Sequence, residues 1–264
     1  MTLNEIENEL IEAAKGLITV EPLAVAMLEQ QILSKKTFGE MLAATLAQQL
    51  GGNLISKEDL EKLFLSEFLK KPSILSDAAC DFEATLERDP ACSLCLDPFL
   101  FFKGYQGIQA YRTAHSLWNE GRTFAAKILQ SVISQKFGMD IHPAAKIGCG
   151  ILLDHATGIV IGETAVIGDN VSIFHGVTLG GSGKQAGDRH PKIGDGVMLG
   201  AHAQLLGNIS IGRGAKIGAG AVVLKNVPAH TTFAGIPAVQ VGRPCNDMPS
   251  LEMQQDFTLD ATDS

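Results

Sequence analysis

The chain has 264 residues, of which 45% are hydrophobic, and a formal net charge of −8. The length suits one large or two modest domains, and the acidic balance argues against a nucleic-acid surface, which needs a basic stripe. No apolar run approaches the roughly 18 residues of a membrane span, and the acidic start MTLNEIENEL does not resemble a secretory signal. We therefore expect a cytoplasmic protein that binds neither nucleic acid nor membrane.

The composition changes near residue 138. Before it the chain is rich in Leu, Glu, Lys, Gln and Ala, and from there to about residue 238 it is rich in Gly, Ile, Val and Ala. Apolar residues of the first part recur at helical spacing in two stripes, Ile6, Leu10, Ile11 and Ala14, and Leu60, Leu63, Phe64 and Phe68. These stripes predict an all-α N-terminal domain over residues 1–138, with a helix-on-helix core.

Boundary signals divide this first part into several helices. Ser56 followed by Asp59 resembles an N-cap with an acidic first turn. Asp97-Pro98 is expected to precede a helix, Gly121 to separate it from the next one, and Gly138 to mark the end of that helix. The helix after Asp97-Pro98 should carry Phe102, Ile108, Tyr111 and Leu117.

The five cysteines indicate neither disulfides nor a metal. They are odd in number, in a chain with no export signal, so reduced thiols are expected. Cys92 and Cys95 form a lone C-x-x-C without a second pair at zinc-site spacing. We interpret all five as buried or incidental thiols: Cys80, Cys92, Cys95, Cys149 and Cys245.

From Ile141 onward an aliphatic residue recurs every six residues, and eight of the thirteen are followed directly by Gly. The thirteen are Ile141, Ile147, Leu153, Ile161, Ile167, Ile173, Leu179, Ile193, Leu199, Leu205, Ile211, Ile217 and Val223. The residue four places later is mostly small, as at Ala145, Thr157, Ala165, Val171, Ala203, Ala215 and Ala221. A fixed short period of this kind is typical of a β-solenoid.

Three hexads make one triangular coil, so the repeat predicts about four coils of parallel strands over residues 139–239. After Val223 the period fades, and residues 240–264 read as a short, flexible, acidic C-terminal tail. The fold class predicted for the whole chain is α+β, with a helical N-terminal domain followed by a parallel β-helix.

Two interruptions of the period mark the expected site. Leu153 to Ile161 spans eight residues rather than six, and Leu179 to Ile193 spans fourteen. A solenoid can eject extra residues only at a corner, because its strands must stay in register, and loops on a rigid scaffold often carry function.

The first insertion contains His155, flanked by Asp154, with Asp140 just before the first hexad. A carboxylate beside an imidazole fixes the tautomer of a general base and stabilises the imidazolium. Asp140 lies close to one coil before His155, so the two are expected to be neighbours. The plainer interpretation is a hydrogen-bonded corner histidine with solvated carboxylates nearby.

The second insertion contains Asp188, Arg189 and His190 in a row. Arg189 beside His190 would suit a small carboxylate ligand, because a guanidinium grips a carboxylate with two parallel hydrogen bonds. A solvated loop tip is the alternative.

These features together resemble the serine O-acetyltransferase family of hexapeptide acyltransferases. The matching segments include MDIHPAAKIG (139–148), LDHATGIVIGETAVIG (153–168), DRHPKIGDGV (188–197) and GAKIGAGAVVLKNVP (214–228). RDPA (88–91) and GYQGIQAYR (104–112) in the helical part are similar too, so the resemblance covers nearly the whole chain. It implies that the β-helix is left-handed.

The resemblance implies acetyl transfer from acetyl-CoA to the hydroxyl of L-serine, giving O-acetyl-L-serine for cysteine biosynthesis. His155 matches the family's base and Asp140 its partner. The positions that match the substrate site are Asp89 and Asp154 for the ammonium, Arg189 and His190 for the carboxylate, and Glu163. Those that match the CoA site are Gly181, Ser182, Ala201, Lys216 and Ala219. Acetyl-CoA would be a co-substrate, with no tightly bound cofactor.

The resemblance also implies partners. Family members are hexamers built from two trimers, with each active site between neighbouring β-helices, and L-cysteine is expected to inhibit at the serine site. Relatives that dock into O-acetylserine sulfhydrylase usually end in isoleucine, whereas this chain ends in Asp263-Ser264. That departure argues against such a complex here.

Rival functions remain open at this point. A related hexapeptide O-acetyltransferase could use homoserine or a sugar as acceptor. A zinc lyase on the same solenoid would need converging histidines with a closely spaced pair, which His155, His175, His190 and His202 do not provide. The last alternative is an inactive scaffold.

Overall fold

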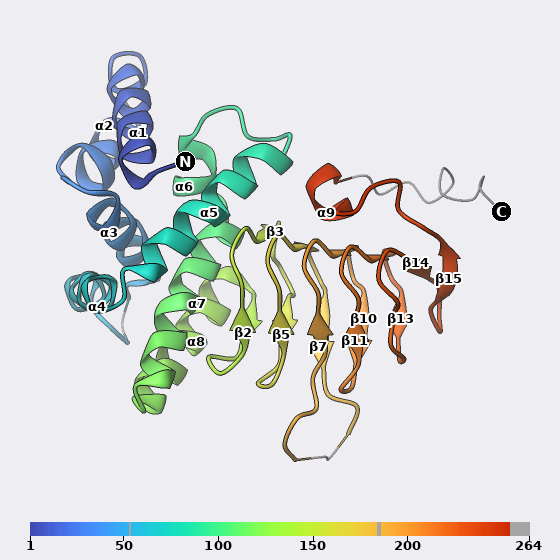
Figure 1. The fold of residues 1–264 in the computed structure, drawn as a ribbon. Helices are drawn as coiled ribbons and strands as arrows, with labels where there is room; N and C mark the ends of the chain where they lie inside the picture. The colour runs from blue at the N-terminus through green and yellow to red at the C-terminus, as the bar shows by residue number, and fades with distance from the viewer. Residues whose placement is uncertain (53, 184–185, 254–264) are drawn as a thin grey trace.

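The computed structural model describes residues 1–52, 54–183 and 186–253. Within these residues, helices form one side of the molecule and a stack of short strands the other (Figure 1). The helical part contains α1 (Leu3–Ile18), α2 (Val25–Leu28), the π-helical turn η1 (Glu29–Leu33), α3 (Phe38–Leu50), α4 (Lys57–Lys70), α5 (Ser73–Arg88), α6 (Leu96–Leu100), α7 (Lys103–Asn119) and α8 (Thr123–Phe137).

The boundary signals act as predicted, with one exception. The Ser56 hydroxyl accepts from the backbone N–H of Asp59 at 3.1 Å and so caps α4. Gly121 and Gly138 have φ of 78° and 69°, and they end α7 and α8 in the left-handed region that favours glycine. The exception is Phe102. Asp97-Pro98 lies inside the short α6, so Phe102 is the extended N-cap of α7 rather than a helical residue.

The second part is a solenoid of short strands. These are β1 (Asp140–Ile141), β2 (Lys146–Ile147), β3 (Leu152–Asp154), β4 (Val160–Ile161), β5 (Val166–Ile167), β6 (Ser172–Phe174), β7 (Thr178–Gly180), β8 (Lys192–Ile193), β9 (Met198–Leu199), β10 (Gln204–Leu206), β11 (Ser210–Ile211), β12 (Lys216–Ile217), β13 (Val222–Val223), β14 (Thr232–Ala234) and β15 (Val239–Gly242).

The strands form the three walls of a triangular prism. Sheet A has the order β1-β4-β7-β10-β13, sheet B the order β11-β8-β5-β2, and sheet C the order β15-β14-β12-β9-β6-β3. All of the pairs are parallel except β14–β15, and the register pairs hexad residue with hexad residue, as in Ile161↔Leu179 and Leu205↔Val223. Twelve of the thirteen hexad residues are buried, and Ile147 packs partly buried against the same core. The predicted parallel β-helix is confirmed.

The chain runs repeatedly from sheet A to B to C, so the prism has three columns of turns. We call them the CA corner, the AB corner and the BC corner after the sheets that they join. The first insertion lies at the CA corner, between β3 and β4, and the second at the AB corner, between β7 and β8. Both insertions are therefore ejected at corners, as predicted.

Two details of the repeat differ from the expectation. Thr157 is exposed, and Ala156 fills the core instead, because the two extra residues of the first insertion shift the inward phase. The coil also continues past Val223. Val227 forms a parallel bridge with Ile211, and Phe233 in β14 pairs with Ile217, so the stack is about five coils high rather than four. A step of four residues from Val223 to Val227 hides this last coil from a strict six-residue count.

The helical part covers the first coil. The Asp81 carboxylate in α5 accepts from the backbone N–H of Ile151 at 2.9 Å, and it also binds the Arg112 guanidinium of α7 at 2.7 Å. Arg112 continues to the carbonyl oxygen of Gly148 at 2.7 Å. This buried network holds the helices in a fixed position on the end of the prism, which removes its exposed strand edge.

The described part of the expected tail has structure of its own. β15 runs antiparallel to β14, and α9 (Pro249–Glu252) returns to the BC corner, where the Ser172 hydroxyl donates to the carbonyl oxygen of Ser250 at 2.8 Å. Residues 254–264, including the C-terminal Asp263-Ser264, lie outside the described residues.

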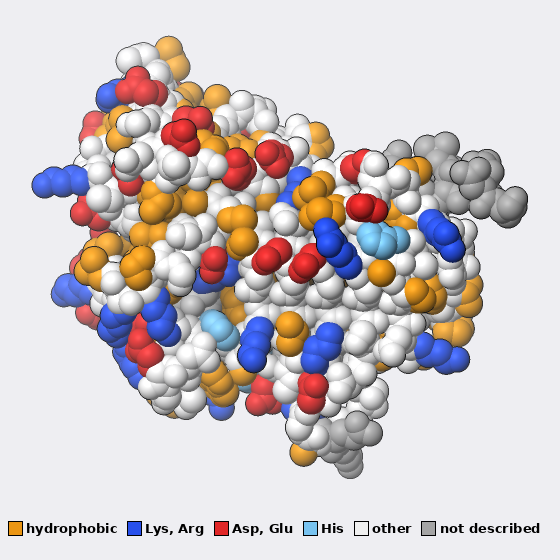
Figure 2. Space-filling view, in the orientation of Figure 1, with side chains coloured by type: hydrophobic (Ala, Val, Ile, Leu, Met, Phe, Trp, Pro, Cys, Tyr) orange, Lys and Arg blue, Asp and Glu red, His pale blue; other side chains and the backbone are white. Residues whose placement is uncertain are grey.

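The surface shows mixed charge. In Figure 2, both acidic and basic side chains are visible on the face of the solenoid. Of the helices in the described residues, none has the length and apolar character needed to span a bilayer.

Candidate active site

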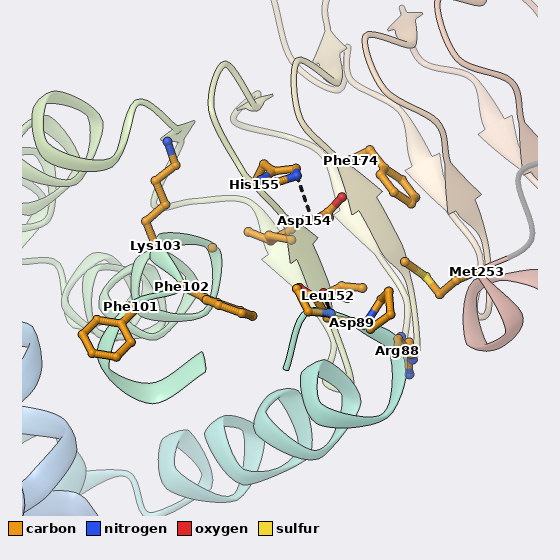
Figure 3. A pocket seen from close by; sticks show the side chains of 14 residues that line it. Arg88, Asp89, Phe101, Phe102, Lys103, Leu152, Asp154, His155, Phe174 and Met253 are labelled. Carbon is orange, nitrogen blue, oxygen red and sulfur yellow. Dashed lines mark hydrogen bonds and ion pairs between the residues drawn. The ribbon is translucent and has the colours of Figure 1, made fainter. Parts of the chain in front are cut away.

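A pocket of about 560 Å³ opens where the helices meet the CA corner. Its walls come from the loop after α5, the start of α7, strands β3 and β6, and Met253 (Figure 3). The polar side chains that line it are Arg88, Asp89, Lys103, Asp154 and His155. The structure thus brings three of the predicted site residues, Asp89, Asp154 and His155, into one cavity.

The backbone at His155 is unusual. His155 and Ala156 both have positive φ, 54° and 57°, a conformation that costs free energy for residues other than glycine. The turn presents the imidazole outward, with 77% of the side chain exposed, and Nε2 lies 3.8 Å from the Asp154 carboxylate. A reactive side chain is therefore held out from a rigid wall, towards open solvent in the single chain.

The helical part supports this turn from one side. The Lys103 ammonium donates to the Thr157 hydroxyl. A Cβ at Gly104 would lie 2.0 Å from the carbonyl oxygen of Leu153, so α7 approaches β3 more closely than any other residue type permits. These contacts fix the turn that carries His155 against the start of α7.

Three histidines stack along the CA corner. The ring of His175 lies 5.8 Å from that of His155 and 4.9 Å from that of His202, both edge to face. The described residues contain no group of three His, Cys, Asp or Glu side chains arranged to hold a metal ion. The ring contacts make this column an aromatic stack along the corner.

The two carboxylates in the pocket interact electrostatically. Burial raises the pKa of Asp154, the neighbouring His155 opposes that rise, and the charge of Asp89 adds to it. Two acidic groups at one end of a partly apolar cavity create a favourable place for a ligand cation such as an ammonium.

Within the described chain, no hydrogen bond or ion pair joins Asp140 to His155. Asp140 lies in β1, where its carboxylate accepts from the side-chain amide of Gln130 at 2.7 Å. The described residue that forms an ion pair with His155 is Asp154.

A second polar cluster lies at the AB corner. The Arg189 guanidinium forms an ion pair with Glu163 at 2.7 Å, and it lowers the pKa of that carboxyl. The Thr164 hydroxyl accepts from the backbone N–H groups of Arg189 at 3.0 Å and His190 at 3.1 Å. These bonds fix the end of the long second insertion against the coil below it.

The same cluster sets the protonation of His190. Nδ1 accepts from the backbone N–H of Thr164 at 3.1 Å, so the proton of the neutral ring lies on Nε2. Burial lowers the pKa of His190, and the adjacent Arg189 lowers it further. Nε2 bonds to none of the described residues, so it is available as a donor.

The positions matched to the CoA site also lie at more than one place on the prism. Ala201 and Ala219 lie at the CA corner in the coils beyond His155, and Lys216 is buried in β12 of sheet C. Gly181 and Ser182 lie at the AB corner, at the start of the second insertion. The substrate and CoA positions therefore each include residues at the CA corner and at the AB corner, whereas Lys216 lies on the wall formed by sheet C.

Sequence reasoning missed several residues of these clusters. Thr164 sits in an ordinary hexad, and Lys103 starts an ordinary helix. Arg88 was noted only as part of the RDPA segment, and Phe174 and Met253 line the pocket without any motif. Their places follow from tertiary contacts, for which neither period nor spacing is a signal.

Three of the cysteines have raised pKa values. Burial raises the pKa of Cys92 to about 11 and that of Cys149 to about 12, so both remain protonated thiols at neutral pH. None of the five forms a disulfide within the described residues.

Comparison with known proteins identifies close relatives over the full length. A protein-family model described as serine acetyltransferase, N-terminal, matches residues 6–110. Another, described as bacterial transferase hexapeptide (six repeats), matches residues 190–225. A curated serine acetyltransferase of Salmonella typhimurium is 50% identical over 92% of this chain and 89% of its own length. A crystal structure of serine acetyltransferase from Vibrio cholerae is 48% identical, with a TM-score of 0.95 over 97% of this chain and 99% of that one.

Solved structures of similar proteins contain ligands. A serine acetyltransferase in complex with cysteine is 46% identical, with a TM-score of 0.93 over 96% of this chain and 98% of that one. A serine acetyltransferase from Brucella abortus in complex with coenzyme A is 45% identical, with a TM-score of 0.90 over 92% and 97%. Soybean serine acetyltransferase complexed with serine is 49% identical, with a TM-score of 0.88 over 89% and 97%.

Proposed function

This chain belongs to the serine acetyltransferase family of acyltransferases, and on that premise we propose that it transfers the acetyl group of acetyl-CoA to the hydroxyl of L-serine. The products are O-acetyl-L-serine and CoA, and the reaction serves cysteine biosynthesis. The observation that carries the proposal is the CA-corner pocket, where an exposed imidazole lies beside two carboxylates.

The serine hydroxyl needs a base, because it is a weak nucleophile at neutral pH. We assign that role to His155, and a positioned base typically contributes about 10² to 10⁴-fold in rate. His155 removes the hydroxyl proton as the serine oxygen attacks the thioester carbonyl carbon. The tetrahedral intermediate then expels the CoA sulfur, and the imidazolium returns the proton to it. Asp140 is proposed as the group that stabilises the imidazolium in the assembled protein.

The remaining groups are proposed to hold serine by its two charges. Asp89 and Asp154 suit its ammonium, because both acidic side chains line the same pocket. Arg189 and Nε2 of His190 suit its carboxylate, and Glu163 orients the guanidinium through their ion pair. For acetyl-CoA we propose Gly181, Ser182, Ala201, Lys216 and Ala219, with CoA as a co-substrate and no tightly bound cofactor.

The division between corners supports an assembled site. The groups proposed for the ammonium and those proposed for the carboxylate lie on different corners, so one serine would be held by the CA corner of one chain and the AB corner of a neighbour. We propose a trimer through the β-helices (residues 139–239) and a hexamer through the helical domain (residues 1–138), with residues 240–264 as the C-terminal segment.

L-Cysteine is proposed to inhibit by occupying the serine site. It carries the same ammonium and carboxylate as serine, with sulfur in place of the hydroxyl oxygen, and a similar protein has been solved with cysteine bound. A cytoplasmic location accords with the use of acetyl-CoA.

The deciding experiment is a thiol-release assay with acetyl-CoA. L-Serine, L-homoserine and a sugar are offered separately as acceptors, and the serine reaction is repeated with L-cysteine. We expect release that depends on L-serine and falls when L-cysteine is added. Faster release with homoserine or the sugar, or none with serine, would contradict the proposal.

A further inference from the structure

Arg88 occupies a place that needs an explanation. It is the last residue of α5, and only 5% of its surface is exposed. No described carboxylate forms an ion pair with it, and its Nε is buried without a partner. Burying a cation among neutral partners costs folding free energy compared with a hydrophobic residue of the same volume. A role of Arg88 therefore has to come from its contacts.

Those contacts all reach the BC corner. Arg88 Nη1 donates to the carbonyl oxygen of Gly150 at 3.0 Å and to the Ser172 hydroxyl at 3.4 Å, and Nη2 donates to the side-chain oxygen of Asn170 at 3.2 Å. The planar guanidinium thus bonds to two successive coils at once. A single ammonium donor cannot reproduce this fork.

The residue after Arg88 is Asp89, which turns the chain away from α5 and lines the pocket. Its backbone N–H donates to the carbonyl oxygen of Thr85 at 3.0 Å, and its carboxylate accepts from the backbone N–H of Ala91 at 2.9 Å. The carboxylate is therefore fixed relative to its own loop. Asp81 also bonds α5 to the first coil, but the Arg88 guanidinium is the α5 contact to the solenoid that lies next to this loop.

We propose that Arg88 is a positioning residue for substrate binding. Its guanidinium fixes the end of α5 on the BC corner and so sets where the Asp89 carboxylate meets the ammonium of serine. The inference rests on the proposed function, of which it deepens one part. It assigns Arg88 no contact with substrate, and it predicts an effect that reaches serine only through Asp89.

The test compares the kinetics of Arg88→Met and Arg88→Lys with those of the wild-type protein. Arg88→Met removes the forked hydrogen bonds of the guanidinium. It should raise KM for L-serine about tenfold or more, with KM for acetyl-CoA within about twofold of wild type. Arg88→Lys keeps the charge but loses the fork, so it should recover only part of the loss. If Arg88→Lys matched the wild type in KM for serine, the positioning role would be overturned, even if Arg88→Met failed to fold.

A double-mutant cycle separates positioning from general destabilisation. In an Asp89→Asn background, Arg88→Met should change KM for serine by less than about twofold, because the group it positions no longer binds the ammonium. A full, additive effect in that background would contradict the inference.

Arg112→Lys is the matched control. Arg112 is equally buried and also ties a helix to the first coil through Asp81 and Gly148, but its chain neighbours Tyr111 and Thr113 do not line the pocket. The Arg112→Lys variant should have a lower unfolding temperature without a selective rise in KM for serine. A selective rise equal to that of Arg88→Lys would refute a specific role of Arg88. If the wild-type protein itself showed no serine-dependent thiol release, the proposed function would fail. If the wild-type protein were active and the Arg88 variants kept a normal KM for serine, only this inference would fail.

Discussion

The two corners that carry the proposed site are built in opposite ways. At the CA corner, a two-residue insertion leaves His155 exposed on a turn of positive φ, with one ion-pair contact to Asp154 at 3.8 Å. At the AB corner, a long insertion returns to the coil, and Thr164 fixes both Arg189 and His190 by hydrogen bonds. The first corner presents a side chain that is free to react, and the second presents groups that are already oriented to bind.

This difference indicates a division of labour between chemistry and recognition. A base has to approach and leave a proton, so it gains from an open position, whereas a carboxylate-binding pair gains from being fixed before the ligand arrives. Because the two corners belong to different edges of one prism, neither is sufficient alone. The predictions below test that division.

The largest expected effect is on the chemical step. His155→Ala should lower kcat by about a hundredfold or more, because the serine hydroxyl then has no positioned base. Steady-state thiol release measures the loss, and an unchanged unfolding temperature shows that the fold persists. A variant that retained near-normal turnover would eliminate His155 as the base.

The next largest effect is a recovery of activity, which requires active sites shared between two chains. Co-expression of His155→Ala chains with Arg189→Met chains should restore about a quarter of the wild-type activity, because some sites then join two intact halves. Each variant expressed alone is the control. Activity no greater than the sum of the two parents would show that each chain completes its own site.

A smaller effect is expected at the recognition corner. Thr164→Val removes the hydroxyl that fixes Arg189 and His190 but keeps a similar volume. We expect KM for L-serine to rise about threefold to tenfold, with kcat little changed, because a net hydrogen bond is worth about 1 kcal/mol. Thr123→Val, at an exposed position at the start of α8, is the matched comparison. An equal fall in kcat for Thr164→Val would argue against a pure binding role.

The smallest effect is on stability, and it has opposite signs at the two corners. The pKa of Asp154 is raised by burial, so its ionisation costs stability as the pH rises through the folded-state pKa. The pKa of Asp188 is lowered by its bond to Lys192, so its ionisation adds stability that is lost as the pH falls through the folded-state pKa.

Asp154→Asn should therefore raise the unfolding temperature at pH 7 by about 1–3 °C, a gain that shrinks towards pH 4. Asp188→Asn should leave the temperature unchanged or lower it slightly, because that side chain is exposed. Thermal unfolding of both variants across this pH range is the measurement. A lower unfolding temperature for Asp154→Asn at pH 7 would mean that its bonds outweigh its burial.

The repeat made most of the solenoid predictable. A side chain every six residues must point inward at each turn of a three-sided coil, so the hexads determine both the sheets and their register. The prediction ended at Val223, because a four-residue step to Val227 breaks the count although the coil continues through Phe233. Phe102 was misplaced for a related reason. Pro98 is compatible with the first turn of a helix, so α6 formed where only a boundary was expected.

The candidate site was predictable only where it interrupts that repeat. His155, Arg189 and His190 stand out because they lie in insertions, where polar residues have no role in the core. Arg88 ends a helix and Thr164 lies in a turn of an uninterrupted hexad, and their roles arise from contacts 62 and 25 residues away along the chain. A local sequence pattern gives no signal for contacts between residues so far apart in the chain.

The closed ends of the prism have a consequence for how copies can meet. One end is covered by the helices, and at the other the backbone of residues 235–238 bonds to both sides of Val222 while β15 runs antiparallel beside β14. Within the described residues, sheet C ends on β15, a four-residue strand whose first three residues are exposed. The strand edge that this end offers to another molecule is therefore short, which limits growth as a fibre.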